Sequence, residues 1–320
     1  MTFTRLLHTG SPVVDFVYRI SDLPAPGEER VASDSAMLPG GAFNMMAAAR
    51  AAGMDVACAG RVGHGPHGDL LMRHLAAHGI PLLLPRVARD SGTCVVLVCA
   101  DAERSFVSYP GADGWLGAAD LAGLFPRRDD VIVVSGYTLS YPDAGPALAA
   151  WIDSLPSARV VAFDPAPVVD RIPQDLRERV LARADWLSCN AAEARILTGA
   201  SETSQAARAL ALGMRRGGVV VRDGPHGCVL ALPAAEPLRL PAPPVRPVDT
   251  NGAGDTHFGA FLAALSRGDP PVEAARYANA AAALAVTREG AAVALTDDEI
   301  RSFAEGSGLS GGRTCRPPRR

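Results

Sequence analysis

Short runs of β-branched residues alternate along most of the chain with longer stretches rich in alanine and leucine. The runs are apolar at consecutive positions, which is typical of strands buried on both faces, and the stretches between them have the length of single helices. This pattern predicts strands at residues 131–135, 159–163, 185–189, 219–222 and 228–232. It predicts helices at residues 144–154, 174–183, 191–198, 203–212, 254–266 and 272–287. Because strands and helices in this order form parallel βαβ units, the expected fold class is α/β, with ligands at the carboxyl ends of the strands.

Two segments break this alternation, because no crossover helix follows their strand-like residues. In the second of them, the sequence TCVVLVCADAERSFVSY at 93–109 predicts a hairpin that turns at 101–103. We interpret residues 12–38 and 91–112 as a small β lid over the main sheet. An exposed β layer must cover its apolar face, so we expect a homodimer through the lid. One domain is expected to span residues 1–305, and residues 306–320 are expected to be a disordered basic tail.

Composition limits the partners and the compartment. The net charge of −3 gives no electrostatic reason to expect nucleic acid or an anionic membrane as partner. No apolar run reaches the length of a membrane span and the N-terminus lacks a signal-peptide pattern, so the cytoplasm is the expected compartment. The six cysteines include no CxxC pair and are expected to be reduced. His64 and His67 lie three residues apart, but they lack the acidic third ligand of a zinc site.

The absence of lysine excludes several kinds of chemistry. All 31 Lys and Arg positions are arginine. A Walker-A phosphate loop needs its lysine, and so do Schiff-base and pyridoxal-phosphate chemistry. If this protein handles phosphate, it must use backbone amides, helix N-termini and arginine.

The strongest chemical signal is the sequence DTNGAGDT at 249–256, directly before a predicted helix. Gly252, Ala253 and Gly254 are small enough to let backbone amides approach an anion at the positive end of the helix dipole. Such amides stabilise charge on a transferring phosphoryl group without a lysine. Asp255 at the helix start can take the proton of an attacking hydroxyl. The alternative interpretation is a capped helix behind a glycine-rich turn, since aspartate is a good N-cap.

Two weaker motifs are compatible with the same chemistry. In PGGAFN at 39–44, adjacent glycines permit a close approach of the backbone to a ligand, and Asn44 offers a donor and an acceptor to polyol hydroxyls. Asn190 and Glu193 lie on one helical face, where they can hold Mg²⁺-bound water and phosphate. Taken alone, the first motif is better explained by an ordinary strand-to-helix turn, and the NxxE spacing of the second occurs by chance in many helices.

Together and in this order, these motifs resemble the ribokinase-like (PfkB) carbohydrate kinase family. The resemblance extends from about residue 10 to residue 303 and includes GRVGHGPHGD at 60–69 and YANAAAALAVTREG at 277–290. It implies a three-layer α/β/α sandwich with a mostly parallel central sheet and a small β lid. It also implies ATP-dependent phosphorylation of a hydroxyl group on a sugar or sugar-like small molecule.

The resemblance assigns a role to each candidate residue. It implies that Asp255 is the catalytic base and that Gly252, Ala253 and Gly254 form the anion hole for the γ-phosphate. The implied substrate contacts are Asp15, Gly41 and Asn44. The implied contacts to the nucleotide, its phosphates and Mg²⁺ are Asn190, Glu193, Gly224, Gly227 and, beside adenine, Asn279. Many family members also bind K⁺, and the matching positions here are Asp249 and Asn251, with backbone carbonyls near Ala285 and Gly290.

Several positions depart from the family pattern. Arginine replaces the usual threonine at position 222, and we predict that Arg222 contacts the nucleotide. An alanine near Ala294 replaces a serine that often closes the cation loop. Phe43 either makes the substrate pocket more apolar or packs in the core. Arg104 in the lid either reaches an anionic or polyol substrate or is a solvated hairpin residue.

Three other functions were weighed against a sugar kinase. A nucleoside kinase of the same family would act on adenosine, inosine or pseudouridine, with Phe43, Phe106 and Tyr109 as candidates for stacking on a base. A nucleotide- or sugar-binding regulator without turnover is disfavoured by the intact GAGD sequence at 252–255. A nicotinamide dehydrogenase is disfavoured because the glycines at 60–68 have the wrong spacing and no acidic residue follows about 20 positions later.

Overall fold

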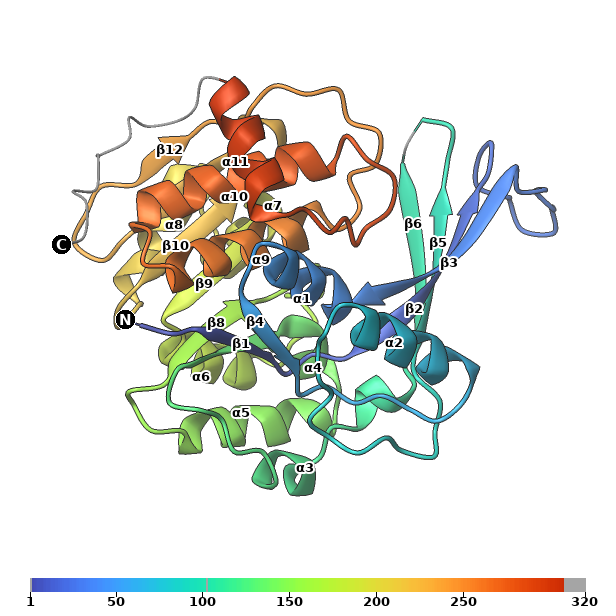
Figure 1. Ribbon diagram of the computed structural model, residues 1–320, viewed down its shortest axis with the longest axis horizontal. Coiled ribbons are helices and arrows are strands. Elements are labelled where there is room, and N and C mark those ends of the chain that lie inside the picture. Colours follow the sequence, from blue (N-terminus) through green and yellow to red (C-terminus); the bar gives the residue numbers. More distant parts are fainter. Residues whose placement is uncertain (1, 102, 308–320) are drawn as a thin grey trace.

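An eight-stranded sheet forms the centre of the protein (Figure 1). The computed structural model describes residues 2–101 and 103–307. The strand order is β12-β11-β10-β9-β8-β7-β1-β4, and every neighbouring pair is parallel except the two pairs that β11 makes. The strands are β1 (Arg5–His8), β4 (Asp55–Cys58), β7 (Asp130–Ser135), β8 (Val160–Asp164), β9 (Trp186–Asn190), β10 (Gly218–Arg222), β11 (Cys228–Ala231) and β12 (Leu238–Leu240).

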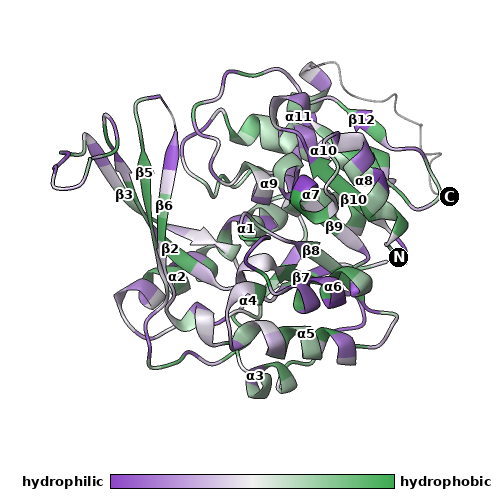
Figure 2. Ribbon diagram, turned by 180° about the vertical axis from the view of Figure 1, so that it is seen from behind, coloured by the Kyte–Doolittle hydropathy of each residue, from purple (hydrophilic) through white to green (hydrophobic). Residues whose placement is uncertain are grey.

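Helices cover both faces of this sheet. One core cluster packs under α1 (Ala42–Ala51), α2 (Pro66–Ala77), α9 (Ala253–Ser266), α10 (Pro271–Ala285) and α11 (Asp297–Gly306). The other lies under α3 (Ala118–Ala122), α4 (Gly136–Ser140), α5 (Ala144–Ser154), α6 (Gln174–Arg183), α7 (Ala191–Thr198) and α8 (Thr203–Leu212). Adjacent strand residues belong to opposite clusters, as Leu6 and Leu7 do, because side chains alternate along a strand. The strands at the centre of the sheet are accordingly hydrophobic in Figure 2.

A second, four-stranded sheet lies beside this body (Figure 1). Its strands are β2 (Pro12–Arg19), β3 (Asp34–Gly41), β5 (Thr93–Val98) and β6 (Arg104–Tyr109), in the order β3-β2-β5-β6. The antiparallel pairing of β5 with β6 confirms the predicted hairpin. One face of the sheet turns toward the body, and the other exposes apolar side chains that include Tyr18, Met37, Val107 and Tyr109. That this sheet acts as a lid stays a prediction.

The α/β fold class and the three-layer arrangement predicted from the sequence are confirmed. The predicted strands and helices occur within two residues of their expected ends, with α9 beginning at Ala253 and α10 ending at Ala285. The predicted tail began at residue 306, but Gly306 is the last residue of α11, and residues 308–320 lie outside the described part of the chain. Among residues 2–101 and 103–307, none of the helices is both long and apolar enough to cross a membrane.

Candidate active site

Three polar side chains stand at the carboxyl ends of neighbouring parallel strands. Asp164 ends β8, Asn190 ends β9 and Arg222 ends β10. Parallel strands place these ends at one edge of the sheet, which is where α/β folds bind their ligands. The first turn of α9 joins them there, because Arg222 donates a hydrogen bond to the carbonyl of Gly254 over 3.1 Å. The structure therefore brings the GAGD turn to the predicted edge of the sheet.

The start of α9 has the geometry of an anion site. Gly252 precedes the helix with a left-handed φ of 70°, and a Cβ on it would lie 2.1 Å from the carbonyl oxygen of Ala291. Only glycine can satisfy both constraints. No side chain caps the helix, and the N–H of Ala253 makes only a long contact of 3.4 Å with the carbonyl of Thr250, so the amides of the first turn are at most weakly engaged within the chain. Asp255 lies inside this first turn rather than at the N-cap, which argues against the capped-helix interpretation.

Asp255 faces the segment predicted to bind substrate. The amide of Asn44, in the first turn of α1, donates to its carboxylate over 3.4 Å. The other polar atom of this buried amide, Oδ1 of Asn44, has no hydrogen-bond partner in the described structure. An unpartnered buried acceptor is costly, and a ligand hydroxyl that donates to it would relieve the cost.

The surroundings of Asp255 change its acidity. Burial raises the pKa of Asp255 to about 7, and the carboxylates of Asp164 and Asp15 act in the same direction. The charge of Arg222 and the hydrogen bond from Asn44 oppose this rise in pKa. A carboxylate with a pKa near the working pH is well suited to accept a proton during a reaction.

Arg222 holds the phosphate side of the site together. Its guanidinium lies 3.2 Å from Asp164 and 3.5 Å from Glu193, and a Cβ on Gly254 would touch it at 3.1 Å. The three charged side chains are between 4% and 14% exposed. Burial, followed by the nearby Asp164 carboxylate, raises the pKa of Glu193, while Arg222 opposes this rise. The positive charge of Arg222 thus compensates the negative charges of two buried carboxylates next to the predicted anion hole.

The predicted NxxE pair is a helix cap in this structure. The amide N–H of Asn190 donates to Glu193 over 2.8 Å, its side chain donates to the same carboxylate over 2.7 Å, and the N–H of Glu193 donates back to Asn190 over 2.8 Å. This reciprocal box begins α7 and points Glu193 at Arg222. No group of three or more potential metal-ligating side chains occurs among the described residues.

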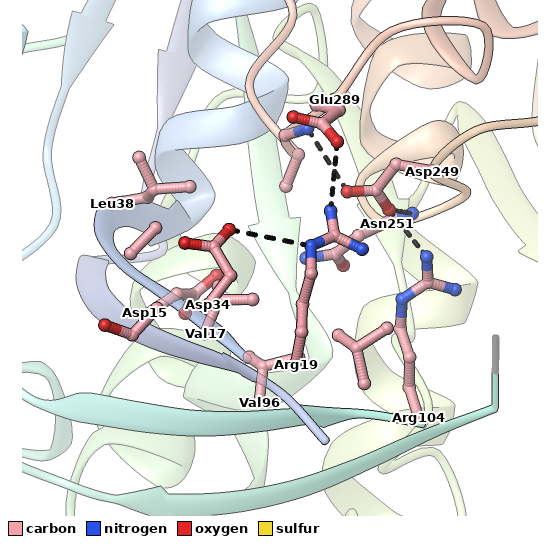
Figure 3. Close-up of a pocket in the computed structure, with 15 residues that line it drawn as sticks. Asp15, Val17, Arg19, Asp34, Leu38, Val96, Arg104, Asp249, Asn251 and Glu289 are labelled. Carbon is pink, nitrogen blue, oxygen red and sulfur yellow. Dashed lines mark hydrogen bonds and ion pairs between the residues drawn. The ribbon is translucent and has the colours of Figure 1, made fainter. Parts of the chain in front are cut away.

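Asp15, a predicted substrate contact, lies between the four-stranded sheet and the body. A cavity of about 100 Å³ there is lined by residues of both parts, including Asp15, Leu38, Val96 and Asn251 (Figure 3). Asp15 is 8% exposed, and burial raises the pKa of its carboxyl group to about 7. A Cβ on Gly40 would lie 2.2 Å from the Asp15 carboxylate. Gly40 therefore makes the close contact at this carboxylate, whereas Gly41 caps α1 with a φ of 60°.

Arg104 is paired with the body of the protein rather than being a solvated hairpin residue, and its contact with a substrate stays a prediction. From β6 it donates to the carboxylate of Asp249 over 2.6 Å and to the hydroxyl of Thr250 over 2.8 Å. The same Asp249 carboxylate accepts the N–H groups of Asn251 over 2.9 Å and of Gly290 over 3.2 Å. Since a guanidinium and two amides already occupy this carboxylate, the predicted K⁺ ligands do not fit a potassium ion in this arrangement.

The comparisons with known proteins agree with this geometry. The profile that describes pfkB family carbohydrate kinases matches residues 4–298. The chain belongs to this family of carbohydrate kinases. Over 306 residues it is 30% identical to the uncharacterized sugar kinase YegV of Escherichia coli (strain K12), and the match covers 93% of this chain and 94% of that protein.

Solved structures place the chain in the same family. A ribokinase from Thermotoga maritima superposes with a TM-score of 0.81 at 27% identity, covering 95% of this chain and 100% of that one. The Arabidopsis thaliana ribokinase, solved with ribose and ATP, gives a TM-score of 0.77 at 25% identity, covering 95% and 99%. The predicted carbohydrate kinase is thereby confirmed, and ATP is its expected phosphoryl donor.

Two of the kinase's predicted nucleotide contacts lie in the turn between β10 and β11. Gly224 is exposed in that turn, and Gly227 has a φ of 90° and would place a Cβ 2.1 Å from the carbonyl of Leu240. Asn279 differs, because it is only 2% exposed and its amide donates to the carbonyls of Leu240 and Pro241. Its side chain supports the backbone at the end of β12, and a contact with adenine stays a prediction.

Sequence reasoning missed three residues of the kinase's site and left one ambiguous. Asp164 and Tyr137 were given no role, although they lie at or just after the carboxyl ends of apolar strands, where ligands were predicted, and Gly40 belonged to the predicted PGGAFN motif without a contact of its own. Burial, followed by the charges of Asp255 and Cys94, raises the pKa of Tyr137, which places this half-exposed ring beside the catalytic region. Phe43 is 1% exposed and packs edge-on against His78, so its packing interpretation is confirmed.

Proposed function

We propose that this kinase transfers the γ-phosphoryl group of ATP to a hydroxyl of a sugar or sugar-like small molecule, with Asp255 as the general base. One observation carries the proposal: a carboxylate with a raised pKa stands in the first turn of an uncapped helix, next to the unpartnered buried oxygen of Asn44. The carboxylate can accept a proton, the N–H groups of the helix can donate to an anion, and the amide oxygen of Asn44 can accept a hydrogen bond from a hydroxyl.

The reaction needs no covalent enzyme intermediate. Asp255 takes the hydroxyl proton as the acceptor oxygen bonds to the γ-phosphorus, and the bond between that phosphorus and the departing ADP oxygen breaks. The amides of Gly252, Ala253 and Gly254 stabilise the charge on the transferring group. Asp15 and Asn44 orient the acceptor, so that most of the catalysis comes from positioning and electrostatics.

The phosphate contacts follow from the position of Arg222. Its guanidinium, held by Asp164 and Glu193, supplies the positive charge that a lysine supplies elsewhere. The turn at Gly224 and Gly227 would lie along the nucleotide phosphates. A magnesium ion would neutralise charge on the phosphates, and Glu193 with Asn190 would hold its water ligands, because Mg²⁺ usually binds through few carboxylates together with substrate phosphates.

The lid and its outer face complete the proposal. The four-stranded sheet would close over the acceptor and exclude water, which suppresses hydrolysis of ATP. Its outer face exposes Val107 at 65% and Tyr109 at 63%, and a second copy of the chain would cover this apolar surface in a homodimer. The cytoplasm, where ATP is available, stays the predicted compartment.

A coupled assay of ADP release tests the proposal against its alternatives. Pentoses, hexoses and nucleosides are offered separately to the wild type in the presence of Mg·ATP. Release that depends on a sugar supports the proposal, and release that depends on a nucleoside supports the nucleoside kinase. Tight ligand binding without any acceptor-dependent release would support the regulator.

The acidity of Asp255 predicts the pH dependence of the reaction. The base must be deprotonated, so kcat/KM should rise about tenfold per pH unit below about pH 7 and level off above it, because burial raises the pKa of Asp255 to about 7. Burial also raises the pKa of Asp15 to about 7, so the wild-type slope should exceed that of the variant Asp15→Asn. A rate that is constant from pH 5 to 8 would contradict both assignments.

Replacing Asp15 by asparagine should mainly weaken binding of the acceptor. Loss of a charged hydrogen-bond acceptor costs about 1.5–3 kcal/mol, so KM for the acceptor should rise by about tenfold or more while KM for ATP stays unchanged. Initial rates over a range of acceptor concentrations measure the effect. The matched control is Asp22→Asn in the loop after β2, whose side chain is 60% exposed. An equal change in both variants would remove Asp15 from the substrate site.

A further inference from the structure

One ion pair joins the four-stranded sheet to the anion hole. Arg104 of β6 and Asp249 are 145 residues apart in sequence, and their side chains, each 15% exposed, meet at 2.6 Å (Figure 3). Asp249 lies three residues before Gly252, and it also accepts the N–H of Gly290 over 3.2 Å. Gly252 in turn packs against Ala291. The carboxylate thus connects the lid, the anion-hole turn and the loop behind that turn.

We infer that Arg104 is a positioning residue that delivers a built-in cation to Asp249 when the lid closes, in place of the potassium ion for which the family pattern has ligands. This inference rests on the proposed kinase function. The guanidinium fits the role better than a free ion does, because it adds directed hydrogen bonds to both Asp249 and Thr250.

Electrostatics explain why a cation is needed at this point. Four carboxylates line the cavity, namely those of Asp15, Asp34, Asp249 and Glu289, against the two arginines Arg19 and Arg104. The negative phosphoryl group must arrive at Gly252, close to Asp249. An unpaired carboxylate there would repel it, whereas Arg104 neutralises the carboxylate and holds it in place.

The same contact couples closure to chemistry. Arg104 reaches Asp249 only while β6 lies against the body, and the cavity that Asp15 lines lies between the two parts (Figure 3). A closed lid therefore orders the anion-hole turn at the moment when the acceptor is covered. When the lid is open, Asp249 has no cation beside it and the turn is less well ordered. Transfer of the phosphoryl group to water is therefore reduced.

Activity of Arg104→Ala in different salts tests the cation role. We expect the wild type to have the same kcat in tetramethylammonium and in potassium buffers within about twofold. The variant should lose about 10²-fold in kcat in tetramethylammonium, the order of loss that a small misplacement of catalytic groups causes. Low, non-denaturing guanidinium or K⁺ should restore part of it, and Arg104→Lys should retain part of it. A wild type that depends strongly on K⁺, or an Arg104→Ala variant as active as the wild type, would overturn the inference.

Amide hydrogen exchange tests the contact between Arg104 and Asp249, which we call the latch, without any turnover. The N–H groups of Asn251 and Gly290 donate to Asp249, and in Arg104→Ala they should exchange at least about tenfold faster than in the wild type. The amides of β6 should exchange faster by a similar factor. The matched control is Arg30→Ala in the lid loop, because Arg30 pairs with Asp22 and Glu28 of that loop. A thermal melt of each variant shows that it is folded.

The exchange result separates the latch from the kinase function. Faster exchange at Asn251 and Gly290 supports the latch even if no acceptor is ever phosphorylated, in which case only the proposed function fails. Unchanged exchange in a folded Arg104→Ala variant would overturn the latch even if the wild type is an active kinase.

Discussion

The variant Asp255→Asn should lose about 10²-fold or more in kcat while it still binds ATP. Asparagine keeps the size of the side chain and its contact with Asn44, but it cannot accept the proton of the attacking hydroxyl. General base catalysis typically contributes 10²–10⁴-fold, and the helix amides that bind the phosphoryl group are left in place. Steady-state ADP release with the best acceptor measures the loss, and calorimetric titration with a non-hydrolysable ATP analogue measures the binding.

The matched control for this loss is Asp153→Asn. Asp153 lies on α5, is 45% exposed and pairs with Arg179, so its replacement should change neither rate nor binding. If Asp255→Asn has the kcat of the wild type, Asp255 is not the base. If it loses ATP binding in parallel with activity, the carboxylate serves the nucleotide site rather than the acceptor.

Replacing Arg222 by alanine should damage both stability and catalysis. The change leaves Asp164 and Glu193 buried without their cation, and breaking a buried ion pair in this way costs about 3 kcal/mol of unfolding free energy. The turn at Gly254 also loses the hydrogen bond that Arg222 donates to its carbonyl. We therefore expect kcat to fall at least about tenfold and KM for ATP to rise. Urea unfolding and initial rates measure the two effects.

Two further variants separate the loss of stability from the loss of activity. Adding Asp164→Asn to Arg222→Ala removes one of the unpaired charges, so it should recover part of the stability and none of the activity. Arg208→Ala is the surface control, since Arg208 is 59% exposed and pairs with an exposed glutamate, and it should change stability by less than about 0.5 kcal/mol. A fully stable and active Arg222→Ala would show that the arginine only fills space.

The fold was predictable from the sequence where single runs were long and apolar enough. The strand VIVVS at 131–135 was found because it is buried on nearly its whole length, and the helix at 144–154 was found by its run of alanine and leucine, whereas the short helix α4 between them was not predicted. The strands RLLH and DVAC, which are four residues long, were not predicted, although RLLH pairs with a strand on each side. A four-residue run has too little periodicity to be distinguished from a turn of helix.

The candidate site was likewise predictable only in its contiguous part. The turn from Gly252 to Asp255 was predictable because its glycines, its acid and the helix after them are contiguous. The pairs Arg104–Asp249 and Arg222–Asp164 join residues 145 and 58 positions apart, and a single sequence carries no local sign of such contacts. Asn279 was singled out by a motif resemblance alone, which gave no sign that its side chain donates to the carbonyls of Leu240 and Pro241, and its contact with adenine stays a prediction.

A crystal structure with an acceptor sugar, ADP and a planar mimic of the transferring phosphoryl group would show whether Asp255 is the base beside an anion hole. We expect an acceptor hydroxyl about 2.6–3.2 Å from the carboxylate of Asp255. We also expect the mimic to lie against the amides of Gly252, Ala253 and Gly254. A phosphoryl mimic bound elsewhere, or an Asp255 carboxylate turned away from the acceptor, would show that these assignments are wrong.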